Sequence, residues 1–285
     1  MAIFCPLSPS AQVQNAQAVL AGSRRFRDSR DMGGMRHFIS LGIALLALAL
    51  PLRAEPVVIF AASSLKTVLD EVIEEKDLDA VAVYGGSAAL ARQIAQGAEA
   101  DVIILAHKDW MNWLDAEGVL ASASRCDVAG NALVLAGANT APDLDVLSEV
   151  DVLNVLKGGR LAVGQLRSVP AGQYTAAYLE GQGWLAALRP HLAEASNVRL
   201  ALALVARQEA PLGFVYASDV VAEPRVRRVF TPKQSDYPLI RYPSALAKDA
   251  RDGAEIALQT IANSHAIFSR NGFLQISQDD ESRCR

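Results

Sequence analysis

From residue 57 onward, short apolar segments alternate with segments that have the apolar spacing of amphipathic helices. The first apolar segment, Val57–Phe60, leads through Ser63 and Ser64 into a helical pattern that continues to Glu75. Strands that alternate with helices are typical of parallel βαβ units, in which ligands bind at the carboxyl ends of the strands. The alternation therefore predicts an α/β fold with any binding site at the points where strands run into helices.

The same patterns predict two lobes that are joined by two crossings of the chain. Strands are expected at 57–60, 81–84, 101–106, 131–137, 160–163, 212–216, 226–230 and 239–246. Helices are expected at 64–75, 88–96 and 108–117, from 170 toward 181, at 198–208, from 217, and in a last segment that ends at Asn271-Gly272. We assign 55–135 and 236–275 to the first lobe, 136–235 to the second lobe, and 276–285 to a disordered tail.

The beginning of the chain has the features of an export signal. Met35-Arg36-His37 precedes an apolar run from Phe38 to Leu52, and the small residue Ala54 follows. This order predicts a secretory signal peptide at 35–54 that is cleaved near Ala54, because the run is shorter than the roughly 20 residues of a membrane span. A single anchoring helix is the alternative. We interpret residues 1–34 as a non-native extension produced by an upstream start codon, with a twin-arginine signal as the weaker interpretation.

Charge and cysteine content exclude several functions. The first 54 residues hold six of the 27 basic and two of the 31 acidic residues, so the remainder carries a net charge of −8. This charge argues against binding to nucleic acid or to an anionic membrane surface. No C-x-x-C spacing supports a zinc or redox site, and pairing between Cys126 and Cys284 is left open.

An enzymatic function has little support in the sequence. The motifs of nucleophile elbows, zinc proteases and phosphate-binding loops do not occur. His107, His191 and His265 stand in unrelated contexts, and only His107 follows a strand end. We therefore expect neither catalytic residues nor direct protein ligands to a metal.

A binding function has more support, because four predicted helix starts present hydrogen-bond donors. Free backbone N–H groups and the positive end of the helix dipole suit an anion, and a compact oxyanion needs many donors. Serines at helix starts are also ordinary caps, and this alternative applies to each of them singly. The donor positions are Ser63-Ser64, Ser87 after Gly85-Gly86, Pro170-Ala171-Gly172, Asn197-Val198, and Tyr216 at a strand end.

After residue 54, the chain resembles the periplasmic molybdate-binding proteins of ABC transporters nearly end to end. The matching stretches include Phe60-Ala61-Ala62-Ser63-Ser64-Leu65, Gly97-Ala98-Glu99-Ala100-Asp101, Val169-Pro170-Ala171-Gly172-Gln173-Tyr174, Asn197-Val198-Arg199 and Gly213-Phe214-Val215-Tyr216-Ala217-Ser218-Asp219. The resemblance implies a two-lobed type II periplasmic binding fold, each lobe a mostly parallel sheet flanked by helices. It also implies a ligand, molybdate or tungstate, that is held between the lobes without a cofactor.

The resemblance further implies which residues bind the oxyanion. Transferred onto this sequence, the ligand set consists of Ser64, Ser87, Ala171, Val198 and Tyr216, so the family selects Ser64 over Ser63. The sequence of this chain departs from the family pattern at Gly86, Gln165 and His107.

The resemblance also implies the partners and the compartment. We expect a periplasmic monomer that delivers its ligand to a membrane permease driven by a cytoplasmic ATPase. A receptor for sulfate, thiosulfate or another tetrahedral oxyanion is the alternative within the binding class. A hydrolase or a sensor domain on the same fold is the alternative from another class.

Overall fold

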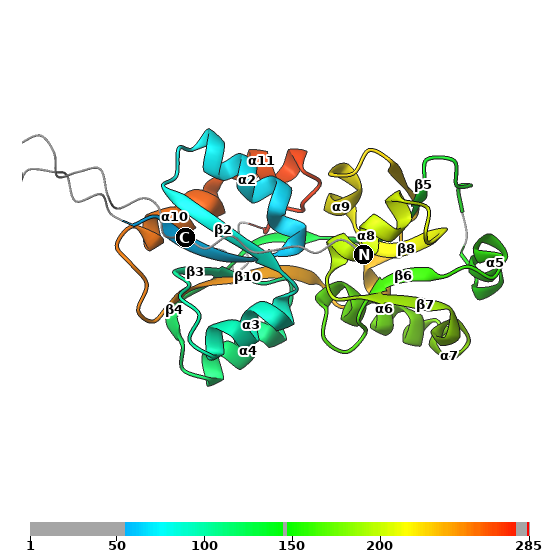
Figure 1. The fold of residues 1–285 in the computed structure, drawn as a ribbon, viewed down its shortest axis with the longest axis horizontal. Coiled ribbons are helices and arrows are strands. Elements are labelled where there is room, and N and C mark those ends of the chain that lie inside the picture. Colours follow the sequence, from blue (N-terminus) through cyan, green and yellow to red (C-terminus); the bar gives the residue numbers. More distant parts are fainter. Residues whose placement is uncertain (1–54, 145–146, 278–283, 285) are drawn as a thin grey trace, which may run out of the picture. The chain divides into compact units, whose positions relative to one another are not determined.

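The computed structural model describes residues 55–144, 147–277 and 284, which form two α/β lobes (Figure 1). The predicted extension at 1–34 and the predicted signal peptide at 35–54 lie outside the described residues. Within the described part of the chain, no helix has both the length and the apolar character needed to cross a membrane.

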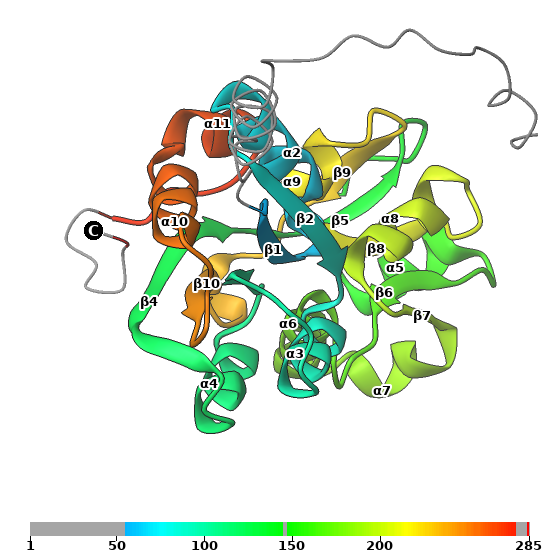
Figure 2. The same cartoon turned by 60° about the vertical axis from the view of Figure 1, so that its left-hand side comes forward.

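The first lobe is built on a five-stranded sheet with the order β2-β1-β3-β10-β4. Its strands are β1 (Val57–Ala62), β2 (Ala80–Gly85), β3 (Val102–Ile104), β4 (Leu120–Asn131) and β10 (Ile240–Ala247). Its helices are η1 (Ser63–Leu65), α2 (Lys66–Glu75), α3 (Ser87–Ala95), α4 (Lys108–Ala116), α10 (Ala254–Asn263) and α11 (His265–Arg270). Helices α2, α10 and α11 lie on one side of the sheet, and α3 and α4 lie on the other (Figures 1 and 2).

Strand β1 shows why this lobe has three layers. Ile59 and Ala61 belong to the core that includes the buried residues of α2, whereas Phe60 belongs to the separate core beneath α3 and α4. Successive side chains of a strand point to opposite faces of the sheet. A strand that is apolar on both faces therefore requires helices on both sides.

The second lobe repeats this construction with the strand order β7-β6-β8-β5-β9. Its strands are β5 (Leu133–Ala138), β6 (Leu161–Gly164), β7 (Leu192–Ala195), β8 (Leu212–Tyr216) and β9 (Val226–Phe230). Its helices are α5 (Glu149–Leu156), α6 (Pro170–Gly181), α7 (Leu185–Leu188), η2 (Arg189–His191), α8 (Val198–Ala206), α9 (Ala217–Val221) and η3 (Gln234–Asp236).

The predicted α/β class and the two lobes are confirmed, but the sheets are mixed rather than mostly parallel. β1 pairs in parallel with β2 and β3, and β6 pairs in parallel with β7 and β8. The other pairs, which all involve β10 or β5, are antiparallel. These two strands follow the crossings between lobes, so each enters its sheet against the direction of the neighbouring βαβ strands.

The crossings also define where one sheet ends and the other begins. The chain leaves the first sheet at Asn131 and enters the second at Leu133, and it returns between Phe230 and Ile240. The predicted division at 135/136 falls inside β5, whose residues pair in the second sheet. Strands β4 and β7 and helix α5 had no counterpart in the predicted elements, and the predicted last helix consists of α10 and α11, which are separated by Ser264.

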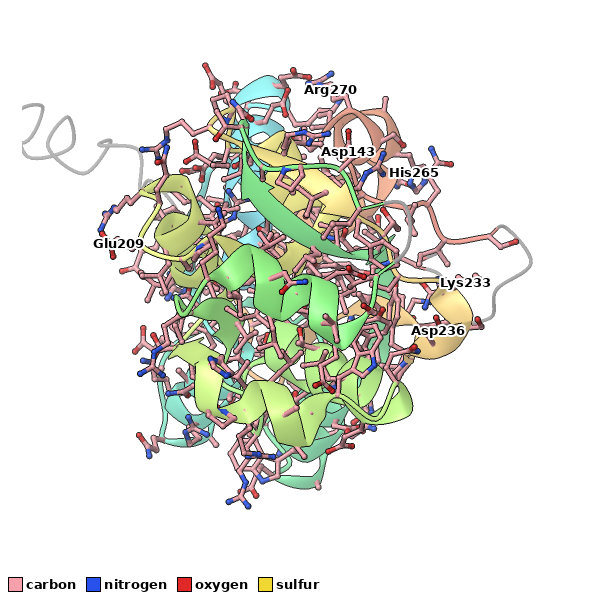
Figure 3. All side chains as sticks on the ribbon, turned by 90° about the vertical axis from the view of Figure 1, so that its right-hand side faces the viewer. Asp143, Glu209, Lys233, Asp236, His265 and Arg270 are labelled. Atoms are coloured by element: carbon pink, nitrogen blue, oxygen red, sulfur yellow. A yellow bond between two sulfur atoms is a disulfide. The ribbon has the colours of Figure 1, made fainter. Side chains whose placement is uncertain are left out.

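A disulfide and a charged periphery complete the fold. Cys126 of β4 is bonded to Cys284, so the pairing that the sequence left open is present. Ile276 is buried as well, whereas 278–283 and 285 of the predicted tail lie outside the described residues. Charged side chains such as Glu209 and Arg270 lie at the periphery (Figure 3).

Candidate functional site

A small pocket lies where the helix starts of the two lobes meet. Its cavity volume is about 10 Å³, and none of the residues that line it carries a charge. The first lobe contributes the ends of β1 and β2 with the residues that follow them and a residue after β3, and the second contributes the starts of α6 and α8 and the end of β8. All five residues of the predicted ligand set line this pocket: Ser64, Ser87, Ala171, Val198 and Tyr216.

Ser87 presents a hydroxyl whose proton is available to a ligand. The residue is 1% exposed, and its Oγ accepts a hydrogen bond of 3.1 Å from the backbone N–H of Ala106. This bond occupies a lone pair of the hydroxyl and leaves its proton free to donate. Helix α3 has Gly86 as its N-cap and no side-chain capping bond, so Ser87 is not an ordinary helix cap.

Ser64 is placed in a similar way on the same side of the pocket. It is 1% exposed, and its Oγ lies 2.9 Å from the hydroxyl of Tyr242 on β10. No side-chain bond caps η1 or α2, so the capping interpretation also fails here. Both serines of the ligand set are therefore held from behind by other parts of the first lobe.

The second lobe contributes backbone donors at two helix starts. Pro170 stands in the first turn of α6, as predicted, and has no N–H, so Ala171 offers the first N–H of that helix. Asn197 caps α8, also as predicted, by accepting a 3.0 Å hydrogen bond from Leu200. The first N–H groups of a helix have no partner within it, and the helix dipole adds partial positive charge at the same place. Ala171 and Val198 thus supply donors without a cationic side chain.

Tyr216 carries an unpartnered polar atom in this pocket. The residue is 1% exposed, and its hydroxyl has no hydrogen-bond partner among the described residues. Burial, assisted by the nearby Tyr242, Tyr174 and Asp219, raises the pKa of Tyr216, so the phenol remains protonated and able to donate. Leaving a buried donor unsatisfied costs about 1–3 kcal/mol. A ligand with an acceptor oxygen would remove this cost.

An ion pair of the second lobe lies next to the pocket, and its arginine bonds to the first lobe. Arg199 Nε is 2.8 Å from the Oδ1 of Asp219, which is fully buried, and Arg199 Nη2 donates a 3.0 Å hydrogen bond to the carbonyl of Ser64. Burial raises the pKa of Asp219 to about 6, against the opposing effect of Arg199 and of the Tyr216 N–H. Asp219 is therefore ionised at neutral pH and balances the charge of the arginine.

Other contacts hold the two lobes together beside the pocket. Trp110 Nε1 of α4 donates to the carbonyl of Ser168 at 3.1 Å, and the hydroxyl of Tyr174 on α6 donates to the carbonyl of Ala106 at 3.3 Å. A Cβ on Gly86 would lie only 2.5 Å from the backbone oxygen of Ser196. The glycine at this departure from the family pattern thus permits close contact between the lobes.

The two other departures also lie at this contact. His107 caps α4 by accepting from the Asp109 N–H at 3.2 Å, and its ring centroid is 5.0 Å from that of Tyr174. Burial lowers the pKa of His107, although Asp109 opposes the shift. Gln165 accepts a 3.0 Å hydrogen bond from the hydroxyl of Ser168, the residue that Trp110 contacts.

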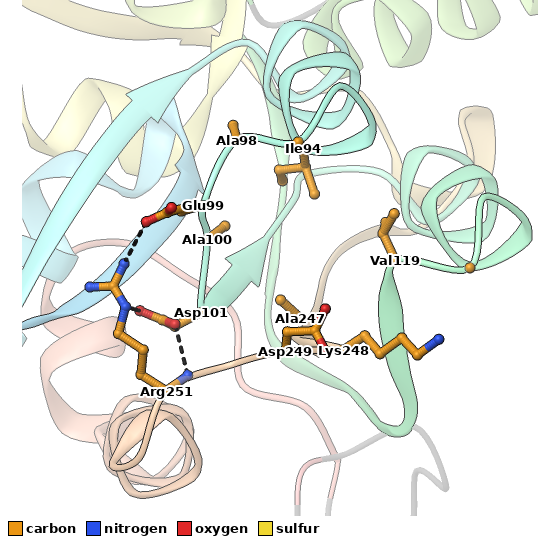
Figure 4. Close-up of a pocket in the computed structure, with 12 residues that line it drawn as sticks. Ile94, Ala98, Glu99, Ala100, Asp101, Val119, Ala247, Lys248, Asp249 and Arg251 are labelled. Carbon is orange, nitrogen blue, oxygen red and sulfur yellow. Dashed lines mark hydrogen bonds and ion pairs between the residues drawn. The ribbon is translucent and has the colours of Figure 1, made fainter.

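A larger hollow of about 550 Å³ lies elsewhere on the first lobe (Figure 4). Three of its charged residues pair with one another: Asp101 accepts from the Arg251 N–H at 2.9 Å, and the Arg251 guanidinium lies 3.3 Å from Glu99 and 3.7 Å from Asp101. These bonds fasten the segment before α10 to the sheet, which gives Glu99, Asp101 and Arg251 a structural role. Among the described residues, no group of three or more histidine, cysteine or acidic side chains is placed to hold a metal ion.

The chain is similar to bacterial binding proteins both in sequence and in fold. Residues 57–274 match the family model of bacterial extracellular solute-binding proteins. The chain is 37% identical over 226 residues to the molybdate-binding protein ModA of Escherichia coli (strain K12), which covers 76% of this chain and 88% of that protein.

Two solved structures share the fold at lower sequence identity. The periplasmic molybdate-binding protein of Azotobacter vinelandii has a TM-score of 0.68 at 22% identity, covering 78% of this chain and 100% of that one. The sulfate-binding protein SubI of Mycobacterium tuberculosis H37Rv has a TM-score of 0.64 at 16% identity, covering 79% of this chain and 88% of that one. The fold is thus common to receptors for different oxyanions.

Proposed function

This chain belongs to the bacterial extracellular solute-binding protein family, and we propose that it captures molybdate, and also tungstate, between its two lobes. It then delivers the anion to a membrane permease that a cytoplasmic ATPase drives. The receptor acts as an exported monomer in the periplasm and carries out no covalent chemistry. Support comes from the ModA relative at 37% identity and from the pocket between the lobes.

The observation that carries the proposal is the buried, unpartnered hydroxyl of Tyr216 in a pocket lined by donors. An anion oxygen placed there would accept this hydrogen bond together with those of Ser64 and Ser87. A hydrogen bond to a charged group contributes about 1.5–3 kcal/mol, and several of them act together in this pocket. Strong binding of an oxyanion therefore requires no lysine or arginine in direct contact with it.

The chemistry of the lining also limits which anions fit. Hydroxyl and backbone N–H donors satisfy an anion that carries no proton, such as molybdate, tungstate or sulfate. Hydrogen phosphate carries a proton that needs an acceptor, and in the pocket that proton would meet donors. Among fully deprotonated tetrahedral dianions, which share charge and shape, the size of the closed pocket sets the preference.

Closure of the lobes is the step that couples binding to delivery. Ser64 and Ser87 come from the first lobe, and Ala171, Val198 and Tyr216 come from the second. An anion that contacts both lobes favours the closed form over the open form, because only the closed form offers all the donors at once. The permease then distinguishes loaded from empty receptor by this closure.

Isothermal titration calorimetry on the purified protein tests the proposal with molybdate, tungstate, sulfate and phosphate in parallel. We expect tight 1:1 binding of molybdate and tungstate, binding of sulfate that is at least 100-fold weaker, and no response to phosphate. Tight sulfate binding without a molybdate response would contradict the assignment and would favour a sulfate receptor.

A further inference from the structure

Tyr242 is buried next to the pocket but does not line it. It lies on β10 with 0% exposure, and its ring packs between those of Tyr216 and Phe273, with centroids at 6.3 and 5.4 Å. Its hydroxyl is 2.9 Å from Ser64 Oγ and 3.1 Å from Asn131 Nδ2. These three polar groups therefore form a line that ends at the pocket.

The orientation of the Asn131 amide determines which group donates in each hydrogen bond along this line. Its Oδ1 accepts from the backbone N–H groups of Ala132 at 2.9 Å and Ser218 at 3.5 Å. A backbone N–H can only donate, so this end of the side chain must be the carbonyl oxygen. The Nδ2 end, which can only donate, then faces the Ser218 hydroxyl at 2.8 Å and the Tyr242 hydroxyl.

The Tyr242 hydroxyl must in turn donate a hydrogen bond to Ser64 Oγ. Its oxygen accepts from Asn131, and burial raises the pKa of Tyr242, so the phenol keeps its proton. Within the described residues, the remaining hydrogen-bond neighbour of the Tyr242 hydroxyl is Ser64 Oγ. The Ser64 hydroxyl thus accepts a hydrogen bond from Tyr242 and must direct its own proton to another acceptor. Because Ser64 lines the pocket, that acceptor can be a bound anion.

We propose that Tyr242 is a positioning residue for ligand binding: the relay Asn131→Tyr242→Ser64 makes the Ser64 hydroxyl a dedicated donor toward the bound oxyanion. The inference rests on the function proposed above and adds to it a reason for selectivity. With the relay intact, Ser64 does not need to rotate when the anion arrives, and its proton already points toward the anion, so a protonated anion oxygen at that position would meet a donor. The relay thus favours dianions without protons over hydrogen phosphate.

A double-mutant cycle separates this role from simple packing. Tyr242→Phe keeps the ring and removes the hydroxyl, whereas Ser64→Ala removes the group through which the relay acts. We expect Tyr242→Phe to weaken molybdate binding, measured by calorimetry, by about 3- to 30-fold in the wild-type background. In the Ser64→Ala background the same change should alter the dissociation constant by less than about twofold.

Tyr178→Phe is the matched control, because Tyr178 is an equally buried tyrosine that packs against Phe214 in the core of the second lobe. It should bind molybdate like the wild type. Asn131→Asp provides a second variant, because a carboxylate accepts the Tyr242 proton and turns Ser64 toward Tyr242 instead of the anion. Its loss of affinity should also shrink when Ser64 is alanine, and the residual loss measures the effect of the added charge.

The outcomes distinguish the relay from the function itself. Equal affinity of wild type and Tyr242→Phe would overturn the relay and leave the molybdate receptor intact. An equal loss in both Ser64 backgrounds would also overturn it, because Tyr242 would then act by packing. Absence of molybdate binding by the wild type would overturn the proposed function and the relay with it.

Discussion

The two walls of the pocket are built differently, although both consist of donors. In the first lobe, the Ser87 hydroxyl is held by the Ala106 N–H and the Ser64 hydroxyl by Tyr242. In the second lobe, the Tyr216 hydroxyl is equally buried but has no partner among the described residues. The first wall is therefore oriented before a ligand binds, whereas the second contains a donor that only the ligand satisfies.

Replacement of Tyr216 tests this difference with the largest expected effect. Tyr216→Phe removes a donor that serves only the anion, so we expect molybdate binding to weaken by roughly 10- to 100-fold. Because the lost hydroxyl is unsatisfied in the free protein, the free energy of unfolding without ligand should be unchanged or higher. Calorimetry and thermal denaturation measure the two quantities, and a marked loss of stability would contradict the description of this wall.

Replacement of Ser87, unlike that of Tyr216, should lower the free energy of unfolding. Ser87→Ala removes a donor to the anion, and it also leaves the Ala106 N–H without its 3.1 Å partner. We expect about tenfold weaker binding together with a loss of about 1–3 kcal/mol in the free energy of unfolding. Ser235→Ala, at an exposed position on η3, is the control and should change neither quantity. If Ser87→Ala left stability unchanged, the two walls would not differ as described.

The smallest effect concerns the contact between the lobes. Burial lowers the pKa of His107, so closure, which packs this ring against Tyr174, disfavours its protonation. The stability of the closed form is then fully present above the ordinary histidine pKa of 6.5 and falls as the pH drops below it. We expect about 2- to 5-fold weaker binding at pH 5.5 than at pH 7.5. His107→Gln should lose the part of this dependence that belongs to His107, whereas the part that comes from Asp219, whose pKa is raised to about 6, should remain. An identical pH profile in both proteins would remove His107 from the closure.

The sequence pattern predicted helix starts well, because these depend on neighbouring residues only. Pro170 and Asn197 mark the starts of α6 and α8 as expected, because their effects act within one turn of helix. Strand β4 was missed because its first half, Leu120–Cys126, is mostly polar or small and only partly buried, so it lacks the apolar alternation of a strand. The antiparallel direction of β10 was missed because it depends on the crossing between lobes and not on the strand itself.

The same limit applies to the site. The five predicted residues meet in one pocket because each stands at a strand end or helix start, which a sequence pattern marks. Tyr242 carries no such mark: it lies inside β10, and its hydroxyl meets Ser64 across 178 residues of sequence. Asn131 ends β4, a strand that the sequence pattern did not predict. Arg199 lay within a matched motif, but its contacts with Asp219 and Ser64 depend on how the lobes meet.

Crystals grown with molybdate and measured at the molybdenum absorption edge test the central claim most directly. An anomalous difference map locates the metal of the anion independently of any assumed binding mode. We predict one strong peak in the pocket between the lobes, at a distance that places anion oxygens within hydrogen-bonding reach of the Tyr216 and Ser87 hydroxyls. A peak in the hollow beside Arg251, or no peak in the pocket of a protein that binds molybdate in solution, would contradict the account.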